Sequence, residues 1–118
     1  MTEDTAWLRG EAVRYGATEA DVDAAIALLR VPDHVVTHAR IELGDRVVTV
    51  DHPGRGHTDH DLTVLVPAAE PGDRPVLFCG DLIEESADPA IDTGSDLASW
   101  PATLDRLLEI GGPDARYV

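Results

Sequence analysis

The chain has 118 residues with 23 acidic and 9 basic side chains, which gives it a formal net charge of −14 at pH 7. Such a negative surface repels phosphate backbones and anionic lipid headgroups, so we expect no nucleic-acid partner and no membrane-surface function. The length suits one hydrophobic core. It predicts a single domain over 1–118, with a helical segment at 1–36 and a segment that contains a sheet at 37–118.

Two helices are predicted before the sheet. The first covers residues 2–15 and is ended by Gly16. The second starts at Thr18, which forms a start similar to a capping box with Asp21, and it is broken before Pro32. Apolar side chains recur at helical spacing in both segments: Leu8, Ala12 and Tyr15 in the first, and Val22, Ala25, Ile26 and Leu29 in the second.

From Thr37 onward the hydrophobic period changes to two residues, which is typical of strands. Gly44 and Asp45 interrupt this pattern and predict the turn of a hairpin. Apolar residues mark the two strands of the hairpin and two later strands: Ile41 and Leu43, Val48 and Val50, Leu62 to Val66, and Val76 to Phe78.

The stretch 84–99 is acidic and rich in proline and glycine, and it predicts a long loop. Long ordered loops are often functional lids. A last helix is expected at 101–110, with Ser99 as its cap and Gly111 at its end. Leu104, Leu107 and Leu108 form the inner face of that helix, and a short strand follows within 114–118.

Two short loops hold most of the residues that can carry chemistry. The first, 52–61, contains the letters GRGHTDHD and lies between two apolar strands. The second, 78–82, reads FCGDL and follows the next strand. Histidine and aspartate at neighbouring strand ends are a common way to hold a divalent metal. The pair of loops therefore indicates a metal site.

These two motifs resemble the second half of a metallo-β-lactamase-fold hydrolase, in which a GHTxxD turn is followed by an apolar strand and then by Gly-Asp. The resemblance is strongest over about 43–117. It implies the α/β (α+β) fold class, as a partial αββα sandwich with N-terminal helices, a mostly antiparallel sheet and a C-terminal helix. The two N-terminal helices would correspond to a variable insertion in the middle of the family's domain.

The resemblance also implies roles for single residues. His57 would ligate the first of two zinc ions, and Asp81 would bridge both. Asp61, Thr58 and His60 would surround these ligands without being required as ligands themselves. Trp100 would belong to the family's WPxTL segment, which packs the last helix beside the site. The residue that would perform catalysis is not identified by these motifs.

Two motifs of the family are missing from the sequence, the HxHxDH loop and the late Pro-Gly-His turn. A catalytic zinc ion needs about three protein ligands and a water molecule. His34 and His38 have the spacing of a helical metal clamp, but Pro32 and the β-branched residues between them favour an extended chain. We therefore expect a truncated or partial copy of the domain, with weak zinc binding or none on its own.

Two functions follow as hypotheses. The chain is part of a zinc-dependent enzyme that hydrolyses an ester, amide or thioester in a small-molecule substrate once it is completed. Alternatively, it is a non-catalytic interaction or structural module that keeps the scaffold. Under either hypothesis, one apolar face of the sheet in this chain is uncovered. We therefore expect a homodimer or a partner that supplies the missing N-terminal half.

The sequence gives a few indications of the cellular environment. Cys79 is the only cysteine and cannot form an internal disulfide, which fits a reducing compartment. It is expected to be a buried, inert thiol that shares a strand face with Asp81. The acidic N-terminus does not resemble a signal peptide, and no apolar run approaches the length of a membrane span. The expected location is the cytoplasm.

Overall fold

Two helices form the N-terminal part of the chain, α1 (Glu3–Arg14) and α2 (Glu19–Leu28). The structure is a computed structural model that describes residues 3–118. Thr2, the predicted start of the first helix, lies outside the described residues. The chain divides into two compact units, the first ending at Val35 and the second comprising Val36–Val118. The helices belong to the first unit and the sheet to the second.

Side chains at the start of α2 hold the two helices together. The Thr18 hydroxyl oxygen accepts a hydrogen bond from the backbone N–H of Asp21 at 3.2 Å, which confirms the predicted cap. Arg9 of α1 forms ion pairs with Glu19 at 2.8 Å and with Asp23 at 2.7 Å on α2. These bonds link the helices on their exposed side.

The end of α1 differs from the prediction by one residue. The helix stops at Arg14, and Gly16 follows with a φ of +99°, a conformation that glycine adopts readily. Tyr15 therefore lies outside the helix and is exposed, so its expected place on the apolar face is wrong.

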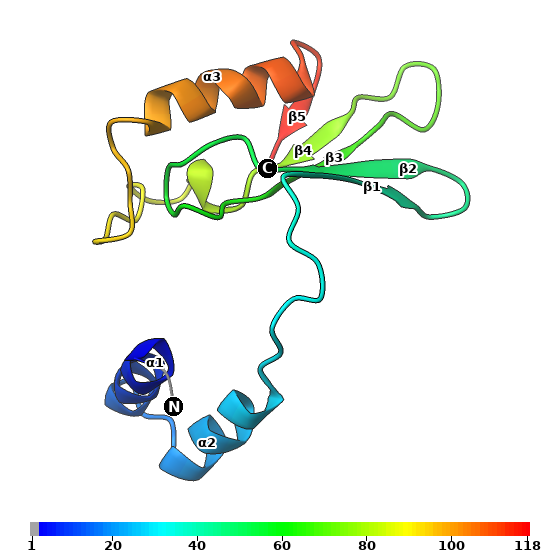
Figure 1. Ribbon diagram of the computed structural model, residues 1–118. Coiled ribbons are helices and arrows are strands. Elements are labelled where there is room, and N and C mark those ends of the chain that lie inside the picture. The colour runs from blue at the N-terminus through cyan, green and yellow to red at the C-terminus, as the bar shows by residue number, and fades with distance from the viewer. Residues whose placement is uncertain (1–2) are drawn as a thin grey trace. The chain divides into compact units, whose positions relative to one another are not determined.

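The second unit contains one five-stranded mixed sheet, and its strands lie in sequence order (Figure 1). The first four strands pair in antiparallel fashion, and β5 pairs with β4 in parallel. The predicted hairpin is confirmed, as is the α+β class. The strands are β1 (His38–Glu42), β2 (Val47–Asp51), β3 (Thr63–Val66), β4 (Val76–Phe78) and β5 (Arg116–Tyr117).

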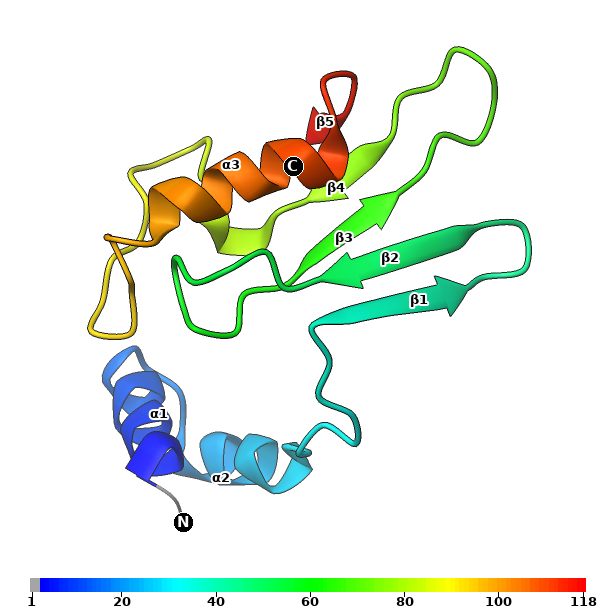
Figure 2. The same cartoon turned by 45° about the horizontal axis from the view of Figure 1, so that its top comes forward.

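The parallel pairing requires a crossover, and α3 (Trp100–Gly111) provides it. Figure 2 shows α3 lying across the sheet beside β4 and β5. Its inward side chains and those of β4 form the core of the unit, because this is where helix and sheet exclude water from each other. The core cluster comprises Leu77, Cys79, Leu82, Trp100 and Leu107, with Leu65, Ile110 and Tyr117 packed against it.

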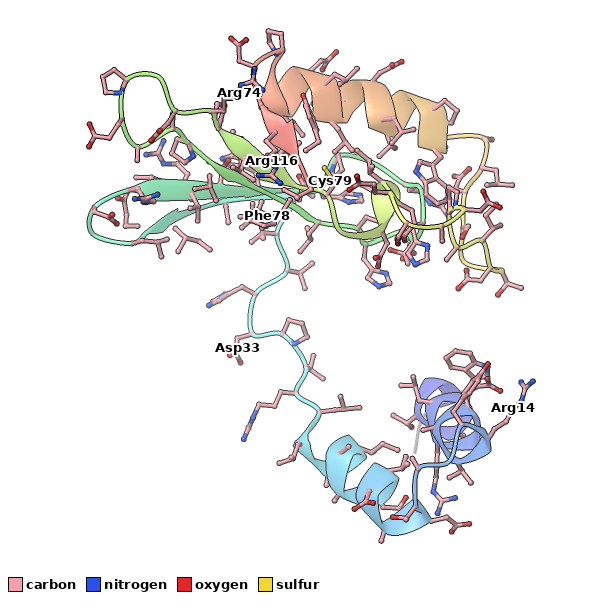
Figure 3. The ribbon with its side chains drawn as sticks, turned by 180° about the vertical axis from the view of Figure 1, so that it is seen from behind. Arg14, Asp33, Arg74, Phe78, Cys79 and Arg116 are labelled. Carbon is pink, nitrogen blue, oxygen red and sulfur yellow. The ribbon has the colours of Figure 1, made fainter. Side chains whose placement is uncertain are left out.

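The opposite face of the sheet is also apolar. Cross-strand partners and alternate residues share a face, so the register that pairs Val50 with Val64 and Val64 with Phe78 defines this open face. Within residues 36–118, all of which the structure describes, no helix covers it. Figure 3 shows Cys79 on the α3 side of the sheet and Phe78 on the other. The open face comprises Ala39, Ile41, Val48, Val50, Val64, Val66, Val76, Phe78 and Arg116.

The start of α3 differs from its prediction. Ser99 makes no side-chain capping bond to the helix, and its hydroxyl donates instead to Asp96 Oδ2 at 2.9 Å. Asp96 Oδ1 accepts from the backbone N–H of Ser99 at 3.0 Å. Asp96 thus satisfies the turn that leads into the helix. Among the described residues no helix is both long and apolar enough to cross a bilayer.

Candidate metal centre

The loop between β2 and β3 carries His57, and two glycines allow it to approach α3. Gly54 has a φ of +144°, and a Cβ there would lie 2.5 Å from Thr103 Oγ1. A Cβ on Gly56 would lie 2.5 Å from the Leu82 side chain. The Thr103 hydroxyl also donates to the loop backbone at a distance of 2.6 Å. The glycines are therefore required for close packing of this loop.

A short turn after His57 is closed by its own side chains. Asp61 accepts hydrogen bonds from the backbone N–H of Thr58 at 2.9 Å and from its hydroxyl at 2.6 Å. His52 Nδ1 donates to the carbonyl of Asp61 at 2.8 Å, which ties the end of the turn to its beginning. The turn keeps the backbone at His57 in one conformation.

The imidazole of His57 has a defined orientation. Its Nδ1 lies 2.9 Å from the carbonyl oxygen of Ala90, 33 residues away. A carbonyl can only accept, so Nδ1 carries a proton, and Nε2 of the neutral ring has a free lone pair. The ring packs edge-on against Trp100, with 6.2 Å between the centroids, and its side chain is 18% exposed.

Asp81 reaches the same place from the other loop. β4 ends at Phe78, and a 3-10 helix, η1 (Gly80–Leu82), follows. Leu82 is buried, and its carbonyl accepts a hydrogen bond from the Trp100 indole at 3.2 Å. Asp81 Oδ2 thereby lies 3.9 Å from His57 Nε2, with its side chain 72% exposed.

A cavity of about 240 Å³ opens beside this pair. Two donors at about 2 Å from a tetrahedral zinc ion lie about 3.3 Å apart, so His57 Nε2 and Asp81 Oδ2, 3.9 Å apart, would become two ligands after a small shift of the exposed Asp81 side chain. Within the part of the chain that the structure describes, no third histidine, cysteine, aspartate or glutamate converges with them. The pair fits a part of a zinc site, not a whole one. The cavity is lined by His57, Thr58, His60, Asp61, Leu62, Cys79, Gly80 and Asp81.

The three residues expected around the ligands all line the cavity. Thr58 and Asp61 bond to each other. His60 is exposed, and its Nδ1 lies 2.8 Å from Asp59 Oδ1. This hydrogen bond lowers the pKa of the Asp59 carboxyl. The metal-binding role of His57 and Asp81, and the supporting roles of Thr58, His60 and Asp61, stay predictions.

Cys79 lies in the core. Its thiol donates to the carbonyl of Leu77 at 3.5 Å, and burial raises the pKa of the thiol. The expectation that Cys79 and Asp81 share a strand face is wrong, because the strand ends at Phe78 and the chain turns into η1. Cys79 is buried and Asp81 is exposed as a result.

The alternative pair, His34 and His38, does not form a helical clamp. No helix covers either residue, and His38 is the first residue of β1. Its Nδ1 lies 2.6 Å from Asp51 Oδ1 on the neighbouring strand. The prediction that Pro32 and the β-branched residues disfavour a helix here is confirmed.

The long loop before α3 contributes contacts that side-chain motifs do not reveal. Besides Ala90, the Ser95 hydroxyl donates to the carbonyl of His57 at 2.9 Å. The backbone N–H of Asp96 donates to the carbonyl of Gly56 at 2.8 Å. Two of these three contacts use backbone groups of the loop, which leave no signature in the residue types.

Comparisons with known proteins support the fold. No protein-family model matches the chain, and no curated protein matches it. The crystal structure of VMB-1 at pH 5.5 superposes with a TM-score of 0.57 and 18% identity, covering 79% of this chain and 42% of that one. The metallo-β-lactamase from Pontibacter korlensis superposes with a TM-score of 0.62 and 24% identity, covering 92% of this chain and 53% of that one.

The extent of these matches is informative. This chain spans about half the length of both solved structures. Most of this chain, 79% and 92% of it, superposes on a portion of their folds. The chain therefore has a partial metallo-β-lactamase fold.

Proposed function

We propose that this chain is part of a metal-dependent hydrolase in which His57 and Asp81 are zinc ligands. The observation that carries the proposal is the convergence of His57 Nε2 and Asp81 Oδ2, 3.9 Å apart at the edge of an open cavity. The likeness to a protein described as a metallo-β-lactamase supports it.

Each of the two side chains is suited to bind a cation. His57 directs an unprotonated nitrogen toward the cavity, since its other nitrogen donates to Ala90. Asp81 is exposed and supplies a carboxylate. Zinc bound in such a site acts as a Lewis acid and activates water for attack on an ester, amide or thioester carbonyl.

The remaining ligands must come from outside the described residues, because these provide only two. The open face of the sheet lies next to the cavity: Leu62 lines the cavity and directly precedes β3, whose Val64 lies on the open face. A polypeptide that covers this face would reach the ligand pair. We propose that this partner is the missing half of the sandwich or a second copy of the chain.

Zinc titration tests the proposal. Spectra of the ¹⁵N-labelled chain recorded with increasing zinc should show weak, selective changes at His57 and Asp81. His57→Ala and Asp81→Ala should each remove them, because one remaining ligand holds zinc poorly. His60→Ala is the matched control, since His60 lines the same cavity but is exposed and paired with Asp59.

The possible results separate three conclusions. Changes centred on other histidines, or none at all at millimolar zinc, would show that this pair is not a metal site. Stoichiometric, tight binding in calorimetry that both substitutions abolish would show that the chain alone provides a whole site. Weak binding that depends on both residues is the expected result.

A second candidate function is a non-catalytic interaction module, which the open apolar face favours. Large exposed apolar surfaces on soluble domains commonly mark contacts with another chain. Ile41 and Phe78 are 44% and 49% exposed on this face. If binding is the only function, association should not depend on zinc or on Asp81.

Mass measurement by light scattering distinguishes the two candidates. The wild-type chain and Phe78→Glu would be compared with added zinc and with a chelator. A zinc-dependent dimer that Asp81→Ala disrupts supports a shared metal site. A dimer indifferent to zinc, but lost in Phe78→Glu, supports the interaction module. A monomer that binds no hydrophobic dye contradicts partner binding through this face.

A further inference from the structure

We infer that the loop segment 90–96 is a clamp that holds the imidazole of His57 in one tautomer, and that Ser95 is its positioning residue. The purpose of this clamp rests on the proposed function, because a fixed tautomer matters most for a metal ligand. The contacts that form the clamp lie entirely within this chain.

Three hydrogen bonds connect the clamp to the loop that carries His57. Ala90 accepts from His57 Nδ1 at 2.9 Å. The Ser95 hydroxyl donates to the carbonyl of His57 at 2.9 Å. The N–H of Asp96 donates to the carbonyl of Gly56 at 2.8 Å. His57 is thus held at its ring and at its backbone by the same short segment.

The Ser95 hydroxyl joins this segment to His57. It accepts a hydrogen bond from the N–H of Asp92 at 3.1 Å while it donates to His57. Asp92 in turn accepts from the N–H of Gly94 at 2.7 Å and from that of Ser95 at 3.2 Å. The turn is therefore closed on itself, and one hydroxyl links it to the metal loop.

The clamp selects between two arrangements of the ring. With Nδ1–H bonded to Ala90, the Nε2 lone pair faces the cavity and Asp81. Without that bond, the proton could move to Nε2 and point toward the Asp81 carboxylate. Nitrogen that carries a proton cannot bind a metal, so the clamp keeps His57 in its ligating form.

The exposure of the residues in the clamp indicates that its contacts position His57 and contribute little to the core. Ala90 is exposed, and Ile91 is also largely exposed, so the segment buries little apolar surface. Segments of this kind contribute little to global stability. The hydrogen bonds of this segment nevertheless converge on His57 and the preceding Gly56.

The tautomer of His57 can be measured directly. Long-range ¹H–¹⁵N spectra of the metal-free chain at mildly alkaline pH distinguish Nδ1–H from Nε2–H in a neutral imidazole. We expect Nδ1–H for His57, with exposed His34 as the reference in the same spectrum. Ser95→Ala should shift the tautomer ratio of His57 toward Nε2–H by roughly twofold to tenfold, the weight of one hydrogen bond.

Two variants serve as controls. Ser95→Thr keeps a hydroxyl and should restore the wild-type ratio. Ser86→Ala removes a hydroxyl from the same long loop but outside the segment 90–96, where it bonds only to the exposed Glu84. This substitution should not change the tautomer ratio of His57. If Ser95→Ala fails to fold, Asp92→Ala opens the turn instead and should shift the ratio in the same direction.

The results also separate this inference from the proposed function. If the His57 proton lies on Nε2 in the wild-type chain, or if Ser95→Ala leaves the tautomer ratio of His57 unchanged, the clamp is contradicted even if zinc binds. If the His57 proton lies on Nδ1 and this preference depends on Ser95, but zinc causes no change at His57, the clamp is supported and the metal site is contradicted.

Discussion

Asp61 accepts two hydrogen bonds from Thr58, one from its backbone N–H and one from its hydroxyl. Both donors are partly buried beside the cavity. Asp61→Ala leaves them without a partner, and the expected loss is about 1–3 kcal/mol in the free energy of unfolding. Chemical denaturation followed by circular dichroism measures it.

Asp59→Ala is the matched control for this prediction. Asp59 lies in the same turn and pairs with His60, but both side chains are mostly exposed. Exposed pairs contribute little to stability because water screens them, so Asp59→Ala should cost much less than Asp61→Ala. An equal loss in the two variants would mean that Asp61 does not hold the turn.

Two neighbouring leucines in α3 provide a test of where the core lies. Leu107 is 1% exposed, whereas Leu108 is 60% exposed, so the predicted place of Leu108 on the inner face of the helix is wrong. Leu107→Ala should lower the free energy of unfolding by about 2–5 kcal/mol, because it leaves a cavity between helix and sheet. Leu108→Ala changes the same atoms in the same helix and should have a much smaller effect. Similar losses in both variants would contradict the packing of α3.

Gly56 has no room for a side chain. A Cβ there would meet Leu82 at 2.5 Å and Trp100 at 3.1 Å, so Gly56→Ala should displace the loop from η1 and destabilise the second unit by about 1–3 kcal/mol. Gly10→Ala is the control: nothing lies within 4 Å, and in the middle of α1 the change should stabilise helix by about 0.5–1 kcal/mol. Thermal unfolding of both variants, followed by tryptophan fluorescence and circular dichroism, checks the opposite signs.

Asp96 should make stability depend on pH in the acid range. Hydrogen bonds from the backbone N–H and then the hydroxyl of Ser99 lower the pKa of the Asp96 carboxyl in the folded chain. The unfolded state therefore binds this proton at a higher pH, about 4. The stability from this group is present above that pH and is lost as the pH falls through the lower, folded value.

Asp96→Asn tests this dependence, because asparagine can still accept hydrogen bonds but does not titrate. The midpoint of thermal unfolding should fall less steeply below about pH 4 in this variant than in the wild-type chain. Asp88→Asn makes the same change of charge at an exposed position of the same loop. Parallel pH profiles for the wild-type chain and Asp96→Asn would contradict the prediction.

Much of the fold follows from short-range patterns in the sequence. Alternating valines predict β2 and β3 because every second residue of a strand lies on the same face, and in both strands these valines lie on the open face. The Thr18 cap was predictable because its partner, Asp21, lies three residues away. Such local signals need no knowledge of the tertiary structure.

The details of the candidate site depend on distant contacts. His57 and Asp81 stand out by residue type, but the orientation of His57 depends on the carbonyl of Ala90, and every residue has a carbonyl. Ser99 was expected to cap the helix but bonds back to Asp96, three residues earlier, because both residues can close a turn at this point and the residue types do not decide between them. The contact with Ala90 has no pattern that the sequence could reveal.

Because Cys79 is buried, its reactivity toward thiol reagents reports on opening of the folded structure. This only thiol belongs to the core cluster and is 1% exposed, so a reagent can reach it only when the packing of that core opens. The rate at which a thiol reagent labels Cys79 therefore measures how often the core opens, and no probe has to be introduced. Comparing labelling rates across denaturant concentrations would distinguish local detachment of the helix from complete unfolding.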